Sequence, residues 1–418
     1  MATVALLGTL DTKGEEYAFL RKQVERAGCD VIMINAGVTS DPGYTVEFTR
    51  AEVAEAADAN IDDLVQAGDR GRAVETQAAG AAVILGRLYR DNRIDGLLGM
   101  GGSGGSSIIS RAMRELPVGL PKLLVSTMAS GDTTPYVDTS DITMMYSVLD
   151  FAGINEVSAQ ILTNAATGIA GMARGYEAYE PIGTGRPLVG ATMYGTTTRC
   201  VDRARQWLGN AGYEVLVFHA TGPGGRSMEA LMDSGHIVAS LDATTTELMD
   251  EVAGGTTTAG PQRLEMAGSL GLPQVVSLGA ADMITFTPSD AVPAEFEDRV
   301  SYQHNPAITL IRANRKDMGR YGRLLCEKLN RATGPVSLFV PRRGLSEYGV
   351  AGGVFHDPEA DEALFETLRT SLAGHVELIE MDTDINDPEF AVAMAKKLDE
   401  HYRKWANTQR VSSEDDEA

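Results

Sequence analysis

A glycine-rich stretch of the chain has the composition of a phosphate-binding loop. Between Gly99 and Ser107 stand five glycines and three serines, directly after the apolar pair Leu97–Leu98. Glycines let backbone amides curl around an anion, and the first turn of a following helix presents unpaired amides at the positive end of the helix dipole. The stretch therefore predicts a strand-to-helix turn that binds a nucleotide phosphate. The predicted contacts are Gly101, Gly102, Ser103, Gly104, Gly105 and Ser106.

This stretch has other interpretations. Gly99, Gly101 and Gly104 match the spacing GxGxxG, but that string alone is weak evidence for a dinucleotide site. No Gly-Lys-Ser/Thr follows, so the stretch is not a Walker loop. The glycines could also serve only a tight turn that lets a helix pack closely on the sheet. Five glycines are more than such a turn requires, which favours phosphate binding.

A second polar turn lies at the end of the first predicted strand. The segment from Gly8 to Glu16 reads Gly-Thr-Leu-Asp-Thr-Lys-Gly-Glu-Glu and opens the first predicted helix. Lys13 places a cation where a ligand phosphate would lie, and Thr12 adds a hydroxyl next to it. The alternative is that this turn only caps its helix and that Lys13 lies in solvent.

A third polar stretch, from Ser126 to Asp138, follows another apolar strand. Its hydroxyls, Thr133 among them, and its carboxylates Asp132 and Asp138 suit a ribose or a hydrated magnesium ion. Ligands of open α/β sheets bind at the carboxyl ends of the strands, where this stretch is expected. Such polar residues also serve as ordinary loop caps, and the sequence leaves both roles open.

The second half of the chain offers weaker candidates for binding a small-molecule substrate. Polar and glycine-rich segments again follow apolar strands, and together they suggest a polar cleft between the two halves. One histidine at a strand end is a candidate acid or base, although a buried, hydrogen-bonded histidine is the more common alternative. The candidate contacts are Thr196, His219, Gly224, Gly225 and Asp242.

Short apolar runs alternate with amphipathic segments along the chain, as in buried parallel strands connected by helices. We therefore predict an α/β protein of two Rossmann-like, doubly wound subdomains with mainly parallel sheets. The order strand, threonine-rich turn, helix, Ala-Gly and strand occurs twice. The two copies are offset by 184 residues, which sets Thr12 opposite Thr196 and indicates a duplication.

The predicted domain boundary follows from local composition. Proline and glycine cluster between Glu180 and Arg186, where we expect a linker. The N-terminal Rossmann-like subdomain, with the glycine-rich phosphate loop, is predicted to span residues 1–183, and the C-terminal one residues 184–408. The acidic segment 409–418 is predicted to be a disordered tail.

Composition excludes several classes of function. The formal net charge of −22 repels nucleic acid, so no nucleic-acid partner is expected. No apolar run approaches the ~20 residues of a membrane span, and the amino terminus enters a strand without a basic region. We therefore expect neither a membrane partner nor a signal peptide. Three widely spaced cysteines fit a reducing, cytoplasmic location.

Several of these segments together resemble a known family. The opening Gly8–Glu15, the loop Gly101–Gly105 and the later segments Gly190–Thr197 and His219–Gly225 are similar to the ATP-binding domain family named after the tomato mosaic virus resistance protein. This family has long been described as uncharacterised. The resemblance spans nearly the whole chain and implies two Rossmann-like subdomains, ATP and Mg²⁺ as ligands, and a homodimer.

The same resemblance implies particular contacts. It implies ATP contacts at Lys13 and along Gly101–Gly105, with Thr12 and Thr133 as weaker candidates. The plant protein's additional carboxyl-terminal domain is expected to be absent from this chain.

Three functions are compatible with the sequence. The first is an ATP-dependent enzyme, an ATPase or a small-molecule phosphotransferase, with Asp132, Asp242 or His219 as a candidate base. The second is a non-catalytic module that ATP regulates. The third, an NAD-linked oxidoreductase, is disfavoured because no acidic residue ends a strand about 20 residues beyond the glycine loop. No HExxH or GxSxG motif is present, and we assign no catalytic residue.

Overall fold

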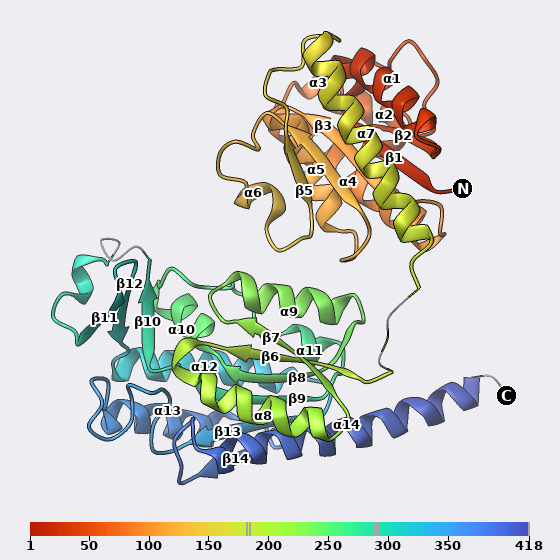
Figure 1. Cartoon of the computed structure of the whole chain (residues 1–418). Coiled ribbons are helices and arrows are strands. Elements are labelled where there is room, and N and C mark those ends of the chain that lie inside the picture. The colour runs from red at the N-terminus through yellow and green to blue at the C-terminus, as the bar shows by residue number, and fades with distance from the viewer. Residues whose placement is uncertain (181–182, 184, 288–291, 417–418) are drawn as a thin grey trace. The chain divides into compact units, whose positions relative to one another are not determined.

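The structure, a computed structural model of the chain, describes residues 1–180, 183, 185–287 and 292–416. The chain divides into two compact units, unit 1 (Met1–Ile182) and unit 2 (Gly183–Ala418). Each unit has a parallel sheet with helices on both faces (Figure 1). The predicted α/β class with two Rossmann-like, doubly wound subdomains is therefore confirmed. In the described ranges, no helix is both long and apolar enough to cross a membrane.

Unit 1 is built on a five-stranded parallel sheet with the order β2-β1-β3-β4-β5. The strands are β1 (Thr3–Gly8), β2 (Asp30–Asn35), β3 (Gly96–Gly101), β4 (Lys122–Ser126) and β5 (Thr143–Tyr146). The helices are α1 (Leu10–Arg26), α2 (Arg50–Glu55), α3 (Ile61–Ala67), α4 (Arg70–Arg90), α5 (Ser103–Arg114), α6 (Thr134–Val137) and α7 (Glu156–Glu177).

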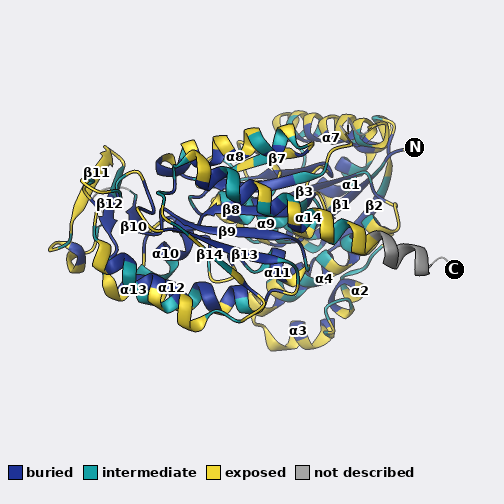
Figure 2. Cartoon of the chain, turned by 90° about the horizontal axis from the view of Figure 1, so that it is seen from below, coloured by how far each residue is buried: buried dark blue, intermediate teal, exposed yellow. Residues whose placement is uncertain are grey.

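Alternate residues of β1 face opposite sides of this sheet. Val4 and Leu6 pack with α1 and α7 on one face, whereas Ala5 and Leu7 pack with α4 and α5 on the other. A strand that is covered on both faces forms a continuous apolar run, and this is why the sequence predicts it. Figure 2 shows the same arrangement as buried strands beneath helices whose outer sides are exposed.

Unit 2 contains a six-stranded parallel sheet and a three-stranded antiparallel sheet with the order β10-β12-β11. The parallel strands are β6 (Leu188–Met193), β7 (Glu214–His219), β8 (Ile237–Thr244), β9 (Gln274–Gly279), β13 (Val336–Pro341) and β14 (Glu377–Met381). The antiparallel strands are β10 (Met283–Phe286), β11 (Ser301–Asn305) and β12 (Ile308–Arg312). The helices are η1 (Gly195–Thr197), α8 (Thr198–Asn210), α9 (Pro223–Asp233), α10 (Thr246–Ala253), α11 (Met266–Ser269), η3 (Ala294–Phe296), α12 (Arg315–Asn330), α13 (Pro358–Ser371) and α14 (Pro388–Asp416).

The antiparallel sheet is a feature that the sequence pattern does not predict. Every residue of β11 is exposed, and its segment Ser-Tyr-Gln-His-Asn lacks apolar alternation. A strand without a buried face carries no period-2 signal.

The two parallel sheets have the same strand order. Taken from its β7 edge, the sheet of unit 2 runs β7-β6-β8-β9-β13-β14, which matches β2-β1-β3-β4-β5 with one further strand. Gly28 and Gly212 precede the second strand of each unit and both have a positive φ, of 84° and 102°. These two glycines are 184 residues apart, so the structure agrees with the repeat that the sequence indicates.

Some helix boundaries differ from the sequence pattern, which predicts helices only from Glu15 and Ile108. Helix α1 begins at Leu10 and α5 at Ser103. The sequence pattern misses these first turns because their glycine and polar residues hide the helical periodicity. Helix α14 continues through Asp416, where we predicted a disordered tail over 409–418. No proline or glycine stands between Ala406 and Asp416 to end the helix. Residues 417–418 lie outside the described residues.

Candidate functional site

The carboxyl edge of the sheet in unit 1 carries a cavity of about 600 Å³, here called the glycine-loop cavity. Strand β1 lies between β2 and β3, so the loops that follow β1 and β3 diverge at this point of the edge. Such a reversal of strand order is where open α/β sheets bind ligands. The cavity is lined by Thr9 and Asp11–Lys13, by Ala36–Thr39, by residues of α3 and the start of α4, and by Gly101–Gly105.

Two glycines of the predicted phosphate loop are required by packing. A Cβ atom on Gly99 would lie 2.3 Å from Cγ2 of Ile109, and one on Gly101 would lie 2.9 Å from backbone atoms of Gly105. Real side chains do not approach so closely. Close packing, the alternative that we weighed from the sequence, therefore explains these two positions.

Packing does not explain the other three glycines. A Cβ atom on Gly102 or Gly105 would meet no neighbour closer than 3.8 Å, and one on Gly104 would meet only the flexible end of Arg70. None of the three has a positive φ. Neither backbone conformation nor contact within the protein thus requires glycine at Gly102, Gly104 or Gly105. The space that they leave opens into the glycine-loop cavity.

The backbone amides of the first turn of α5 border this space. The amide of Ser106 donates to the carbonyl of Gly102 at 2.8 Å, which closes the first helical bond. The amides of Ser103, Gly104 and Gly105 have no acceptor in the part of the chain that the structure describes, and no side chain caps the helix. Three unpaired donors at a helix N-terminus favour an anion.

Ser106 is a predicted contact to which the structure gives another role. Its side chain is completely buried, and its hydroxyl donates to the carbonyl of Gly101 at 3.2 Å and lies 2.6 Å from Oγ of Ser126. These bonds join the glycine loop to the end of β4. The hydroxyl therefore stabilises the loop from behind.

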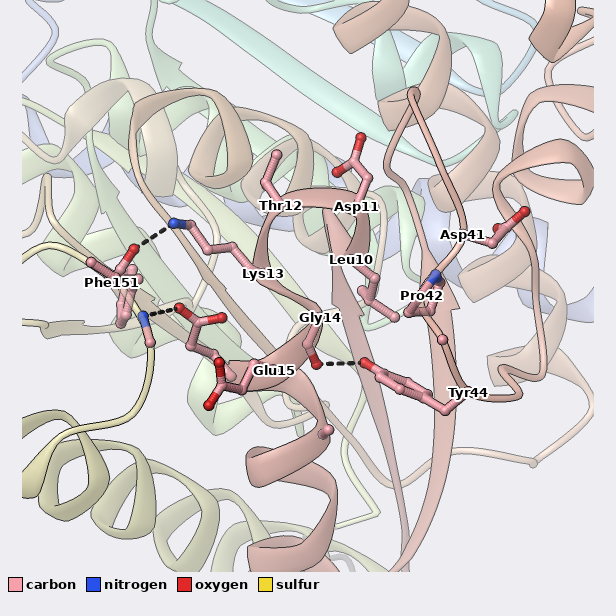
Figure 3. A pocket seen from close by; sticks show the side chains of 15 residues that line it. Leu10, Asp11, Thr12, Lys13, Gly14, Glu15, Asp41, Pro42, Tyr44 and Phe151 are labelled. Carbon is pink, nitrogen blue, oxygen red and sulfur yellow. Dashed lines mark hydrogen bonds between the residues drawn. The ribbon is translucent and has the colours of Figure 1, made fainter.

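Lys13 and Thr12 lie on the first turn of α1, next to a kink in this helix. Lys13 has non-helical backbone angles (φ −129°, ψ 26°), so the helix is kinked directly after its first turn. Its Nζ atom donates to the carbonyl of Phe151 at 2.5 Å, as Figure 3 shows. The exposed hydroxyl of Thr12 donates to the carbonyl of Thr9 at 3.2 Å.

The same turn also borders a second cavity, of about 590 Å³, which Figure 3 shows and which is here called the Tyr44 cavity. Asp11, Thr12 and Lys13 line both cavities. Tyr44 closes the second cavity on one side, where its hydroxyl donates to the carbonyl of Gly14 at 2.8 Å. Lys13 is thus the cation that the two cavities share.

Asp11 holds the turn against the neighbouring loop. Its Oδ2 atom accepts hydrogen bonds from the amides of Val38 and Thr39 at 2.9 and 3.0 Å and from the Thr39 hydroxyl at 2.9 Å. Its Oδ1 atom is buried and has no hydrogen-bond partner within the described residues. Asp11 therefore positions two loops that line the glycine-loop cavity.

Arg70 is a site residue that sequence reasoning missed. It is exposed at the start of α4, and its Nη2 atom lies 3.3 Å from the position that a Cβ atom would take on Gly104. Among the described residues it has no ion-pair partner. Nothing in the local sequence identifies it, because Arg70 and Gly104 come together only when α4 packs beside α5.

Thr133 and Asp132, in contrast, are not part of the glycine-loop cavity. Thr133 precedes α6 and makes no capping bond with its side chain. Asp132 is exposed, and its Oδ1 atom accepts a hydrogen bond from the amide of Thr134 at 3.0 Å. Asp132 thus acts as a loop cap, which is the alternative that the sequence left open, whereas no side-chain hydrogen bond within the described residues gives Thr133 that role.

In unit 2, the glycine-rich turn before α9 already holds a carboxylate of the protein. Oε1 of Glu247 accepts hydrogen bonds from the amides of Gly222 and Gly225 at 2.7 and 3.1 Å. A Cβ atom on Gly224 would lie 1.8 Å from the carbonyl oxygen of His219. Gly224 and Gly225, candidate substrate contacts, therefore have a structural role, because Glu247 occupies the amides that a ligand would use.

Asp242 belongs to the same buried network. It forms an ion pair with Arg263, which also pairs with Glu247 at 2.7 Å and with Glu229 at 3.3 Å. Asp242 and Arg263 are 2% and 1% exposed. A carboxylate so enclosed and paired is placed to stabilise unit 2, and this does not support its predicted role as a base or a substrate contact.

At the carboxyl edge of the parallel sheet of unit 2, Thr196 lies in η1, after β6, and His219 is the last residue of the neighbouring strand β7. Thr196 is buried, and its Oγ1 atom has no hydrogen-bond partner within the described residues. His219 is exposed rather than buried, and its ring stacks on Tyr194 with a centroid distance of 5.5 Å. The structure therefore corrects the alternative of a buried, hydrogen-bonded histidine.

The protein side chains alone do not form a metal centre in the described ranges, where no group of three His, Cys, Asp or Glu residues is arranged to hold an ion. A divalent cation in this site would depend on ligand oxygens and water for most of its coordination, as Mg²⁺ commonly does.

Comparison with known proteins identifies the family of this chain. Residues 2–178 match the N-terminal domain, and residues 186–402 the C-terminal domain, of the uncharacterised protein family UPF0261. The chain belongs to this family. A UPF0261 protein of Clostridium tetani is 49% identical over 94% of this chain and 98% of its own length, and one of Rhizobium meliloti is 43% identical over 97% of this chain and its full length.

The family extends to a plant protein. The tomato (Solanum lycopersicum) ToMV susceptible protein tm-1(GCR26) is 36% identical over 94% of this chain, which spans 54% of the tomato protein. Among solved structures, a UDP-GlcNAc 2-epimerase from Neisseria meningitidis is 10% identical over 66% of this chain and 82% of its own, with a TM-score of 0.22. Similarity at that TM-score carries no functional argument.

Proposed function

We propose that unit 1 binds a nucleotide, ATP with Mg²⁺, with the phosphates on the first turn of α5. One observation carries this proposal. Gly102, Gly104 and Gly105 are glycines that neither backbone conformation nor internal packing requires, and they border a 600 Å³ cavity beside three unpaired amides. A ligand whose oxygens approach the backbone accounts for glycine at all three positions.

Charge supports the same ligand. The chain has a net charge of −22, yet Arg70 and Lys13 both line this cavity. Neither has an ion-pair partner within the described residues. Arginine and lysine side chains bind phosphate through charge-assisted hydrogen bonds, which are stronger than bonds between neutral groups. The two cations stand on separate elements, α4 and α1, and both belong to the lining of the cavity that would hold the phosphates.

ATP is proposed as the nucleotide because the motifs resemble those of an ATP-binding family. An NAD-linked function is disfavoured by position, because the glycine loop follows β3 and the next strand ends at Ser126, which is not acidic. Mg²⁺ would be held mainly by phosphate oxygens and water. ATP then serves either an enzyme that acts on a small metabolite or a module that ATP regulates.

Calorimetric titration with ATP, ADP and NAD, with and without Mg²⁺, tests the proposal. The decisive variant is Gly104→Val, which fills the cavity while the nearest protein atom is a flexible guanidinium. We expect it to lower ATP affinity by more than about tenfold. Gly171→Val is the matched control, since Gly171 is an exposed helical glycine with no neighbour within 4 Å of its Cβ position.

Two results would contradict the proposal: wild-type protein that binds no ATP, or a Gly104→Val variant that binds it as well as the control does. If ATP binds, measuring phosphate release in the presence of candidate acids and sugars would distinguish an enzyme from a module that ATP regulates.

A further inference from the structure

One part of the lining of the glycine-loop cavity, here called its wall, is apolar. It is formed by Leu64 and Val65 of α3 and by Ala73 and Val74 of α4. The cavity therefore has a polar side that suits phosphates and an apolar side that suits a different chemical group. From this asymmetry we infer that the wall is the subsite for the base of a purine nucleoside triphosphate, an inference that rests on the proposed function.

The wall is a built surface. Leu64 and Ala73 are buried in a small core with Ala54 and Ile61, which fixes α3 against α4. The side chain of Asn60 caps α3 by accepting hydrogen bonds from the amides of its first turn. A helix of only seven residues is thereby held in place by packing and by its cap.

Val65 is the most exposed of the four residues that form this wall. It lines the cavity and is 46% exposed, and its neighbour Val74 is half-buried. A single exposed valine is ordinary on a protein surface. Here it borders a cavity whose other side is an anion-binding turn, so a ligand with both a phosphate chain and a flat apolar group would cover it.

The two units differ at this wall. In unit 2 the connection from β7 to β8 contains one helix, α9, whereas in unit 1 the connection from β2 to β3 contains α2, α3 and α4. In unit 2, moreover, Glu247 accepts hydrogen bonds from the amides of the turn after β7, the strand that matches β2 in strand order. The additional helices of unit 1 thus supply the apolar wall of the glycine-loop cavity.

The chemistry of the wall also indicates which nucleotide bases it can distinguish. Aliphatic side chains contact the face of a base but do not read its hydrogen-bonding edge, so selection follows apolar contact area. Of the polar neighbours, Asp69 already accepts a bond from the Arg72 amide, and Arg70 is directed to the glycine loop. ATP and GTP should therefore bind with similar affinity, and both should bind more tightly than CTP.

The test compares probes with and without a base. The variant Val65→Ser/Val74→Ser and the control Val83→Ser, an exposed valine of α4 outside the cavity, are titrated with Mg²⁺ and ATP, GTP, CTP or inorganic triphosphate. We expect the double variant to lose about tenfold in ATP affinity from the lost apolar contact. Its affinity for inorganic triphosphate should match that of the control.

The outcomes separate this inference from the function on which it rests. Gly104→Val should weaken both ATP and inorganic triphosphate, because it acts on the phosphate side. If the double variant binds ATP as the control does, or if CTP binds as tightly as ATP, the base subsite is wrong while phosphate binding stands. If the wild type binds neither ATP nor triphosphate, the proposed function fails and the subsite fails with it.

Discussion

Arg70 and Gly104 are neighbours in the folded chain: Nη2 of the arginine lies 3.3 Å from where a Cβ atom on the glycine would stand. One residue begins α4 and the other lies in the first turn of α5. A cation thus stands beside unpaired helix amides, and both favour an anion at the same place.

Arg70→Ala should weaken ATP binding by about tenfold, since a hydrogen bond to a charged group contributes about 1.5–3 kcal/mol and this side chain is exposed. Titration at low and high ionic strength checks it, because screening should narrow the difference between variant and wild type. Arg72→Ala, an exposed arginine of the same helix outside the cavity, is the control. Equal losses in both variants would mean that the effect is one of overall charge.

Lys13→Met should lower ATP affinity by about tenfold, because it removes the cation shared by the two cavities while keeping the length of the side chain. It also removes the bond to the Phe151 carbonyl, so amide hydrogen exchange should increase around Phe151–Gly153. Lys22→Met, on an exposed part of α1, should change neither measurement. Unchanged ATP affinity in Lys13→Met would remove this residue from the site.

Glu247→Ala should destabilise unit 2 by about 3–5 kcal/mol, because it leaves Arg263 short of a partner and the amides of Gly222 and Gly225 unpaired. Urea unfolding followed by tryptophan fluorescence measures this, since both tryptophans, Trp207 and Trp405, belong to unit 2.

A matched comparison for that prediction is Glu362→Ala, which breaks an exposed ion pair with Arg369. Such a pair contributes at most about 1 kcal/mol. Similar losses in the two variants would show that the buried carboxylate does not hold the turn before α9.

The stability of unit 2 should depend on pH through Glu229. Burial raises the pKa of this carboxyl to about 7, and Arg263 offsets only part of the rise. A glutamate in the unfolded chain titrates near ~4.3, so between these values the folded chain binds more protons than the unfolded chain does. The free energy of unfolding should therefore fall as the pH rises from about 4.5 to about 7, and this contribution should level off above that range.

Glu229→Gln should remove that component, whose slope is at most about 1.4 kcal/mol per pH unit. The measurement is the urea midpoint, followed by tryptophan fluorescence, from about pH 5 to about pH 8. If the urea midpoints of the wild type and the variant change with pH in the same way, a group other than Glu229 is responsible for the pH dependence.

Much of the fold could be predicted because its signals are local. Val4 to Leu7 form an apolar run that is long enough to be recognised without knowledge of its partners, and Ala27-Gly28 marks the end of the following helix. Strand β11 of the antiparallel sheet could not be predicted, since it buries no face and so has no pattern to detect. The end of α14, beyond residue 408, was missed because its acidic composition suggested disorder, although no residue there breaks the helix.

The candidate site divides in the same way. By itself, the sequence determined where glycine-rich turns follow strands, and the Gly101–Gly105 and Gly222–Gly225 turns are alike in this respect. Only the tertiary structure decided which of them remains open. Glu247 reaches the amides of Gly222 and Gly225, whereas Arg70 and Val65 line a cavity beside the Gly101–Gly105 turn. The physical reason is that backbone conformation follows from neighbouring residues, whereas the side chain that fills or faces a turn comes from an element far along the chain.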